Sequence, residues 1–282
     1  MSASLPSLPL LLEPDALEPL LDHPDLLILD ASSAANYQRG HVPNAIHIAP
    51  QALQNGIQPA VGKLPSVEQL SALFASVGLT PDKHVIAYDD EGGGWAGRLL
   101  WTLEVLGHHR YSYLNGGLPA WANEGHPLEA DASVGVPSQF VAQIHPESIA
   151  TLDYIRDHLG DHSFAVWDAR SPDEYVGRKV VAARGGHIPG AINLDWIELM
   201  DRRRNLRLLP LEVLSERLQA LGLTPDKTIV THCQTHHRSG LTWLAMKVLG
   251  YPDIKGYDGS WGEWGNRSDT PVDLSFATRT EM

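Results

Sequence analysis

The chain has 282 residues, of which 43% are hydrophobic, and a single cysteine, Cys233. At about 150 residues per domain, this length predicts two domains, each large enough to bury its own core. The formal net charge of −13 argues against a nucleic-acid or anionic-membrane partner, because both bind basic surfaces. One cysteine excludes an intramolecular disulfide framework and a cysteine-rich metal cluster. No nucleotide or dinucleotide fingerprint is present either, so we expect neither a metal nor an organic cofactor.

The chain shows no sign of a membrane or export segment. No apolar run is long enough to span a bilayer, and prolines break the apolar residues 5–21, which no basic segment precedes. We therefore expect a soluble, cytoplasmic protein.

The sequence contains an internal duplication with an offset near 145 residues. The segments recur in the same order in both halves: LLILDASS (26–33) as FAVWDARS (164–171), GHVPNA (40–45) as GHIPGA (186–191), GLTPDK (78–83) as GLTPDK (222–227), and GGLPAW (116–121) as GSWGEW (259–264). A period of this length is too long for a solenoid repeat, so each copy is predicted to be a complete domain. We place the first domain at 1–128, a linker at 129–148 and the second domain at 149–282.

Each copy alternates between strand-like and helix-like segments. In chain order these are 26–29 (strand), 67–77 (helix), 84–88 (strand) and 97–106 (helix), then 164–167 (strand), 211–221 (helix), 228–232 (strand) and 240–249 (helix). The alternation predicts an α/β fold with a mostly parallel sheet in each domain and helices on both faces. Ligands of such sheets bind beyond the carboxyl ends of the strands, where the loops 89–96 and 233–239 are expected.

These two equivalent loops differ in their chemistry. The second reads Cys233-Gln234-Thr235-His236-His237-Arg238-Ser239, with a thiol, two histidines and an arginine, whereas the first begins Asp89-Asp90-Glu91 and has no nucleophile. A thiol reacts as the thiolate, whose formation is favoured at helix N-termini and beside cations. The second loop thus suits an anionic sulfur. The acidic first loop would repel one, so we expect the first domain to be catalytically inactive and to wall off the site.

Structural interpretations of the same loop stay open. Cys233 can be a buried structural residue, and His236 and His237 can be solvated residues of a loop tip. Metal binding by the CxxHH pattern lacks further ligands at motif spacing. His232 precedes the loop on an apolar strand and is interpreted as a core residue.

A second group of cations precedes GHIPGA in the second copy only. Eleven residues separate Tyr175 from His187, against three between Tyr37 and His41, and the additional residues include Arg178, Lys179 and Arg184. The insertion can bind an anionic substrate, or it can be a solvated surface loop.

Taken together, these features resemble the tandem-domain rhodanese sulfurtransferases. The resemblance rests on the duplication, GHIPGAINL after the first strand of the second copy, the loop headed by Cys233, its aspartate counterpart in the first copy, and KGYDGSWGEW at 255–264. The loop CQTHHRS is similar to that of bacterial thiosulfate sulfurtransferases. It differs from the CGSGVT-like loop of mercaptopyruvate enzymes and from the mammalian CRKGVT loop, whose lysine position is Thr235 here.

The resemblance implies a thiosulfate:cyanide sulfurtransferase that works by double displacement through a persulfide on Cys233. Residues 234–239 would form the cradle of the persulfide, and Arg238, Arg184 and Arg178 would bind the substrate. The implied partners are a small anionic sulfur donor, thiosulfate, and a thiophilic acceptor such as cyanide or a thiol. We expect a monomer, because a tandem pair of half-sites is complete in one chain.

Two other classes of function remain as alternatives. Phosphatases with an HCx5R loop also hold a thiolate over a helix, but here only four residues separate Cys233 from Arg238. A non-enzymatic binding module would be favoured if both loops lacked a nucleophile, and only one does.

Overall fold

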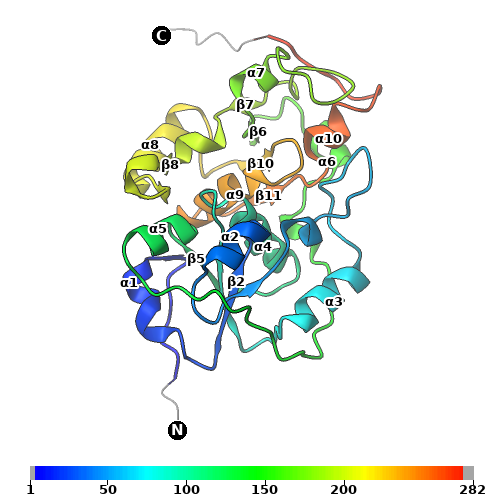
Figure 1. The fold of residues 1–282 in the computed structure, drawn as a ribbon. Coiled ribbons are helices and arrows are strands. Elements are labelled where there is room, and N and C mark those ends of the chain that lie inside the picture. Colours follow the sequence, from blue (N-terminus) through cyan, green and yellow to red (C-terminus); the bar gives the residue numbers. More distant parts are fainter. Residues whose placement is uncertain (1–3, 276–282) are drawn as a thin grey trace.

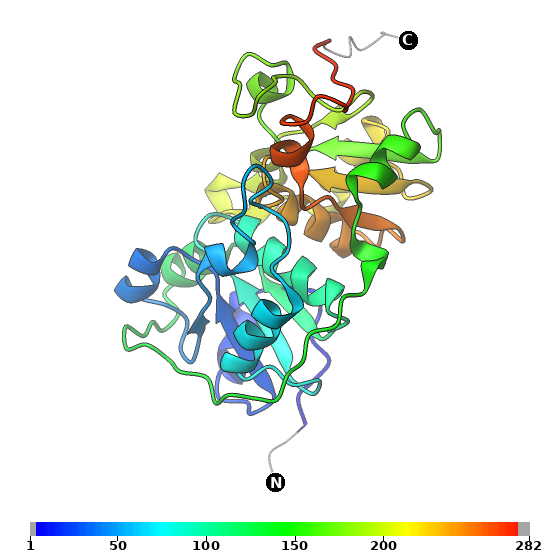
Figure 2. The same ribbon diagram turned by 90° about the vertical axis from the view of Figure 1, so that its right-hand side faces the viewer.

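The computed structural model describes residues 4–275 and shows two α/β domains stacked end to end (Figures 1 and 2). The first domain contains a five-stranded sheet in the order β1-β5-β4-β2-β3, with every neighbouring pair parallel. Its strands are β1 (Leu11–Leu12), β2 (Leu26–Asp30), β3 (Ile46–His47), β4 (His84–Tyr88) and β5 (Tyr111–Leu114).

The second domain repeats this arrangement with a four-stranded parallel sheet in the order β11-β10-β6-β7. Its strands are β6 (Phe164–Asp168), β7 (Ile192–Asn193), β10 (Thr228–His232) and β11 (Ile254–Gly256), and an antiparallel pair is formed by β8 (Met200–Asp201) and β9 (Arg207–Leu208). Two domains with parallel sheets flanked by helices confirm the predicted fold class.

Helices connect the strands of both sheets. The α-helices are α1 (Pro14–Leu17), α2 (Ala34–Arg39), α3 (Val67–Ser76), α4 (Gly94–Val105), α5 (Gly117–Asn123), α6 (Leu152–Asp157), α7 (Pro172–Tyr175), α8 (Leu211–Ala220), α9 (Arg238–Val248) and α10 (Ser260–Trp264). Short 3₁₀ helices are η1 (Glu18–Leu20), η2 (Pro50–Leu53), η3 (Pro146–Ser148), η4 (Trp196–Leu199) and η5 (Arg202–Arg204). Helices α4 and α9 begin three and two residues before their predicted starts, at Gly94 and Arg238, because an apolar helical pattern does not mark a glycine or an arginine as helical.

Side chains of the central strands alternate between two layers of helices. In β2, Leu27 joins the core that contains Phe74 of α3, and Ile28 joins the core that contains Trp121 of α5. The first of these cores also contains residues of the second domain, among them Trp167 of β6 and Leu244 of α9. The two domains therefore share buried apolar surface. None of the helices formed by residues 4–275 has the length and apolar character that a membrane crossing requires.

Residues 129–148 follow the outside of the first domain (Figure 2). Glu129 pairs with His41 in a short antiparallel bridge, and the backbone N–H of Ser138 donates to Ala75 at 2.9 Å. Near the end of the segment, the N–H of His145 donates to the carbonyl of Val105 at 2.7 Å. These hydrogen bonds fasten the connecting segment to the first domain over much of its length.

Helices α4 and α9 follow the two equivalent loops and pack against each other between the domains (Figure 1). They cross at a pair of glycines, where a Cβ atom on Gly97 would overlap the carbonyl of Gly240. A Cβ on Gly240 would in turn overlap the backbone nitrogen of Arg98. The small residues thus allow the two backbones to touch and set the position of one domain on the other.

We expect Gly97→Ala to destabilise the protein, although alanine normally favours a helix over glycine. The added methyl group meets backbone atoms that cannot rotate away, and such overpacking costs about 1–3 kcal/mol of unfolding free energy. Urea denaturation followed by circular dichroism measures this change. A midpoint equal to or above that of the wild type would contradict the close packing described here.

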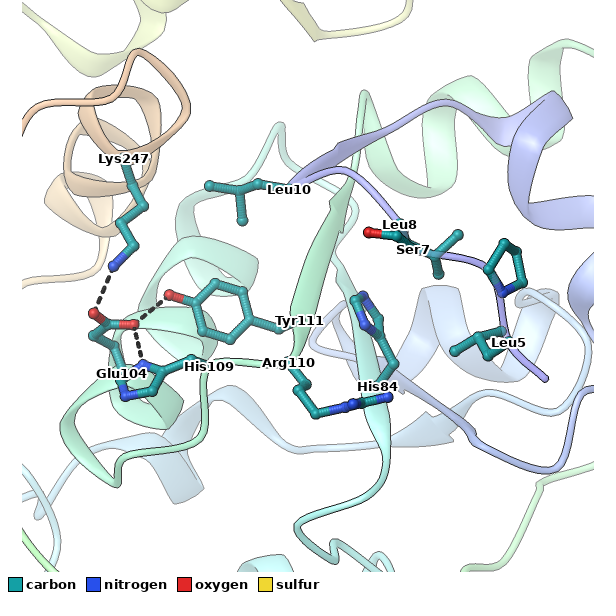
Figure 3. A pocket seen from close by; sticks show the side chains of 11 residues that line it. Leu5, Ser7, Leu8, Leu10, His84, Glu104, His109, Arg110, Tyr111 and Lys247 are labelled. Carbon is teal, nitrogen blue, oxygen red and sulfur yellow. Dashed lines mark hydrogen bonds and ion pairs between the residues drawn. The ribbon is translucent and has the colours of Figure 1, made fainter.

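A mostly buried carboxylate also ties the two domains together. Glu104 of α4 accepts hydrogen bonds from Lys247 of α9 at 2.5 Å and from the Tyr111 hydroxyl at 2.6 Å, and it contacts Nδ1 of His109 at 3.0 Å (Figure 3). These side chains line one wall of a cavity of about 590 Å³, whose other wall includes Leu8 of the N-terminal segment. Burial would raise the pKa of Glu104, but its three partners outweigh burial and lower it.

We expect Glu104→Gln to destabilise the protein at pH 7 by about 1–3 kcal/mol, the usual cost of weakening a buried charged hydrogen bond. A carboxyl group whose pKa is lowered by folding stabilises the protein fully above its unfolded-state pKa. This contribution is lost as the pH falls from the unfolded-state pKa through the lower folded-state pKa. Urea unfolding at pH 7 and pH 4 tests the sign. The difference between the variant and the wild type should shrink at pH 4, and a larger difference there would contradict the account.

Candidate active site

Cys233 lies directly after β10, the strand between β6 and β11, and α9 begins five residues later. The thiol therefore lies at the carboxyl edge of the sheet, in front of a helix N-terminus, as expected from the sequence. Its residue is only 1% exposed, so the sulfur is enclosed rather than displayed on the surface. His232, the last residue of β10, is fully buried with Nδ1 3.1 Å from the Cys233 carbonyl oxygen.

The segment that contains KGYDGSWGEW holds the first half of the loop in place. The backbone N–H of Trp261 donates to the carbonyl of Cys233 at 3.0 Å, and the N–H of Gly262 donates to that of Gln234 at 2.9 Å. The Ser260 hydroxyl receives the N–H of Cys233 at 3.4 Å. These bonds orient the loop carbonyls toward α10.

The surroundings of Cys233 favour its thiolate form. Burial alone would raise the pKa of the thiol, but the charges of Arg238 and His237 and the hydroxyl and N–H of Ser239 outweigh it and lower the pKa. Ser239 belongs to the first turn of α9, where backbone N–H groups favour an anion. Its hydroxyl also lies 2.7 Å from Nδ1 of His236, which is fully buried.

Arg238 is held by the carboxylate of Glu174, a residue outside the predicted site. Its two terminal nitrogens donate to Glu174 at 2.7 and 2.9 Å, a bidentate pair that joins the loop to α7. Burial opposes ionisation of Glu174, but Arg238 outweighs it and lowers the pKa of that carboxyl to about 2. The equivalent residue of the first copy is Asn36, whose amide donates to Asp90 at 2.5 Å. The exchange of Asn36 for an acid in the copy that contains Arg238 was the sequence signal that could have predicted this pair.

The upstream arginines have protein partners of their own. Arg184 donates to the carbonyls of Thr270 at 2.8 Å and Trp264 at 3.0 Å, and thus fastens the inserted loop to the segment after α10. Arg178 lies at the surface and pairs with Asp173 at 2.6 Å. Their assignment to substrate binding stays a prediction.

The loop of the first domain shows what this type of turn can hold. The carboxylate of Asp89, the counterpart of Cys233, accepts hydrogen bonds from the backbone N–H groups of Glu91, Gly92, Gly93 and Ala96 at 2.8–3.1 Å. Burial and the charge of Glu91 nevertheless raise the pKa of Asp89 to about 6. The strand–loop–helix turn of this chain is thus built to surround a negatively charged group with N–H donors.

The first domain also covers the loop of the second. The Gln54 side chain donates to the carbonyl of Thr235 at 3.1 Å, and Lys63 pairs with Glu263 at 2.6 Å. The side-chain amide of Gln234 donates to the carbonyl of Val181 at 3.3 Å. The cysteine loop therefore contacts both residues 54–64 of the first domain and the inserted loop of the second.

His237 forms the most direct contact between the two equivalent loops. Its Nε2 contacts the carboxylate of Glu91, and its ring stacks on Trp95 with centroids 4.1 Å apart. His237 is one-fifth exposed, and His236 is fully buried, so neither is a solvated residue of a loop tip. Glu91 was interpreted as part of a loop that repels a thiolate, but it lies against the histidine whose charge lowers the pKa of Cys233.

The arrangement offers a thiolate, cations and N–H donors. Within residues 4–275, no group of three or more histidine, cysteine, aspartate or glutamate side chains could hold a metal ion.

Two parallel-sheet domains, one of which carries a cysteine loop at the start of a helix, are typical of rhodanese sulfurtransferases. Comparison with known proteins identifies the same family. The model of the rhodanese-like domain matches residues 13–124 and again 151–267, so the chain belongs to the rhodanese family and consists of two tandem rhodanese domains. This confirms the resemblance inferred from the sequence.

Particular relatives narrow the class further. The chain is 52% identical to a thiosulfate sulfurtransferase of Azotobacter vinelandii over 95% of this chain and 98% of that protein. It is 51% identical to a thiosulfate sulfurtransferase of Pseudomonas aeruginosa, with the same two coverages. Among solved structures, the anaerobic ergothioneine biosynthesis enzyme of Chlorobium limicola matches with a TM-score of 0.85 at 21% identity, covering 95% of this chain and 70% of that one. That likeness supports the fold.

Proposed function

We propose that this protein is a thiosulfate sulfurtransferase that carries sulfane sulfur as a persulfide on Cys233. The observation that carries the proposal is a single enclosed thiol whose pKa is lowered by Arg238, His237 and Ser239 at the start of α9. The identity of about half of all residues with thiosulfate sulfurtransferases, over nearly the whole chain, supports thiosulfate as the donor.

The reaction proceeds in two displacements. The Cys233 thiolate attacks the outer sulfur of thiosulfate, the sulfur–sulfur bond of the donor breaks, and its electron pair leaves with sulfite. The enzyme then carries Cys233–S–S⁻. A thiophile such as cyanide attacks the terminal sulfur, forms thiocyanate and returns the thiolate. Neither step needs a proton transfer, so the protein acts by stabilising negative charge on sulfur.

The two loops of the chain support a division of labour for that stabilisation. In the first domain the anion of the loop is its own Asp89 carboxylate, which takes up the N–H donors. In the second domain the Cys233 side chain is shorter, so the persulfide takes the place of the anion that accepts the loop N–H groups. Residues 234–239 would surround its terminal sulfur. The first domain is accordingly catalytically inactive and contributes residues that border the site.

Steady-state kinetics tests the proposed function. Thiocyanate formation from thiosulfate and cyanide should give parallel double-reciprocal plots, because sulfite leaves before cyanide reacts. Release of phosphate from aryl phosphates without any thiocyanate formation would favour the phosphatase alternative instead.

We also propose that the protein is a monomer in the cytoplasm and binds no nucleic acid. The site is bordered by two domains of one chain, and the net charge of −13 opposes binding to polyanions. Analytical ultracentrifugation should give a single species near 30.9 kDa. A stable dimer would contradict the monomer.

A further inference from the structure

Arg98 of α4 is a fully buried arginine of the first domain whose donors are only partly used. Its Nη2 donates to the carbonyl of Leu53 at 2.8 Å, and its guanidinium lies 4.8 Å from the centre of the Trp101 ring. Nε and Nη1 are buried and have no hydrogen-bond partner among the described residues. Burial lowers the pKa of Arg98 to about 10, so the side chain is still a cation at neutral pH. A buried cation requires a compensating neighbour.

His236 of the cysteine loop lies against the same tryptophan. Its backbone adopts the left-handed conformation with φ 55°, and its ring meets the Trp101 ring edge-on at 4.4 Å between centroids. Nδ1 is 2.7 Å from the Ser239 hydroxyl, whereas Nε2 is buried without a hydrogen-bond partner in the described structure. Burial and then the charge of Arg98 lower the pKa of His236, so the ring is neutral and carries one proton.

The surroundings of His236 favour one of the two positions for that proton. An arginine only donates hydrogen bonds, so a nearby imidazole is most stable with a lone pair, not a proton, on its free nitrogen. Nε2 is the free nitrogen here, and the proton then lies on Nδ1 and is donated to Ser239. The oxygen of Ser239 is then an acceptor, which leaves its own hydroxyl proton available to the Cys233 sulfur, in agreement with the lowering of the Cys233 pKa by Ser239.

We propose that Arg98 is a positioning residue for sulfur transfer: it fixes His236 as the Nδ1–H tautomer, so that the Ser239 hydroxyl donates to the sulfur of Cys233. The first domain lacks a nucleophile but would act on the reacting sulfur through this relay. The inference rests on the proposed role of Cys233 and adds Arg98, His236 and Ser239 in defined roles.

Several other charges surround the relay. Arg98 also interacts with the carboxylate of Asp258, which receives the N–H of Leu64 at 2.9 Å. His232 and His237 act on His236, and Arg238 and His237 act on Cys233 directly. Glu174 and Glu91 in turn pair with Arg238 and His237. Substitution of Arg98 leaves the pairs of Glu174 with Arg238 and of Glu91 with His237 in place, but it removes the interaction of Arg98 with Asp258 and its direct interaction with Cys233.

Nitrogen NMR of the full chain labelled with ¹⁵N-histidine tests the tautomer. The signals of His236, assigned by their loss in His236→Gln, should show a protonated Nδ1 and an unprotonated Nε2 that do not titrate between pH 5 and 8. A proton on Nε2, or titration of the ring in this range, would overturn the proposal. This measurement needs no catalysis, so it is independent of whether the protein transfers sulfur from thiosulfate.

The second test follows the rate of Cys233 alkylation by iodoacetamide as a function of pH. In Arg98→Met the rate near pH 6 should fall by about three- to tenfold, the equivalent of one hydrogen bond to the thiolate. Arg98→Lys, which keeps the charge, should recover most of it. His236→Gln, which keeps Arg98 but removes the relay, should show a similar fall, and a wild-type rate in that variant would assign the effect of Arg98 to its direct interaction with Cys233 and overturn the relay. Arg110→Met removes an exposed arginine of the same domain and should have no effect.

Thermal unfolding of each variant identifies any general loss of structure. If Arg98→Met does not fold, two measurements still test the proposal. They are the alkylation rate of Arg98→Lys relative to the wild type and the tautomer of His236 in the wild type. An unchanged alkylation profile in a folded Arg98→Met protein would overturn the proposal, even if the wild type forms a persulfide.

Discussion

Replacement of Cys233 by serine is expected to abolish sulfur transfer from thiosulfate to cyanide. Serine preserves the shape of the loop, but its hydroxyl neither ionises near neutral pH nor forms a persulfide. Loss of an enzyme nucleophile lowers kcat on the order of 10⁴-fold or more, and no second cysteine exists to replace it. Colorimetric thiocyanate measurement under saturating thiosulfate gives the rate.

The control for this variant is a measurement of whether Cys233→Ser is folded like the wild type. Circular dichroism and the thermal midpoint should match the wild type closely, because the sulfur-to-oxygen exchange leaves packing almost unchanged. Residual thiocyanate formation above the uncatalysed rate, in a preparation free of wild-type enzyme, would remove Cys233 from the proposed mechanism.

Opposite effects on the thiol are expected from the two members of the Arg238–Glu174 pair. Arg238→Met removes the largest electrostatic stabilisation of the thiolate and should raise the pKa of Cys233. Glu174→Gln removes the carboxylate that neutralises Arg238 and should lower that pKa further. Alkylation by iodoacetamide below the thiol pKa should slow by about tenfold in the first variant and accelerate in the second.

Both variants should also be less stable than the wild type. Breaking a buried ion pair by removing one partner costs about 3–5 kcal/mol, and we expect the lower end because Arg238 is one-fifth exposed. Arg217→Met, which removes an exposed arginine paired with Glu198, is the matched control. Equal shifts of the alkylation profile in the same direction for Arg238→Met and Glu174→Gln would contradict the electrostatic role of the pair.

The repeated segments were sufficient to predict two α/β domains and the position of the cysteine loop at the sheet edge. Buried strands have apolar side chains toward both faces, so 84–88 and 228–232 could be located to the residue. The loop after each strand follows from the parallel topology, and the thiol could be placed at the sheet edge without coordinates.

The contacts that tune the thiol depend on how the domains pack and could not be derived from the sequence. Glu91 and Arg98 lie about 140 residues before the loop they act on, and only the crossing of α4 and α9 brings them to it. The inward orientation of His236 follows from its left-handed backbone conformation. This conformation is uncommon for residues other than glycine, so it could not be predicted from the presence of a histidine. Glu174 alone had a visible signal, its exchange for Asn36 between the copies.

We propose that each chain carries one sulfur atom on Cys233, and intact-mass spectrometry tests this most directly. Incubation with thiosulfate and removal of excess donor should increase the mass of the wild-type chain by one sulfur atom, and cyanide should reverse the increase. Peptide mapping should place the added atom on Cys233, and Cys233→Ser should gain none. A wild-type protein that turns over thiosulfate without any cyanide-labile mass increase would contradict the persulfide mechanism.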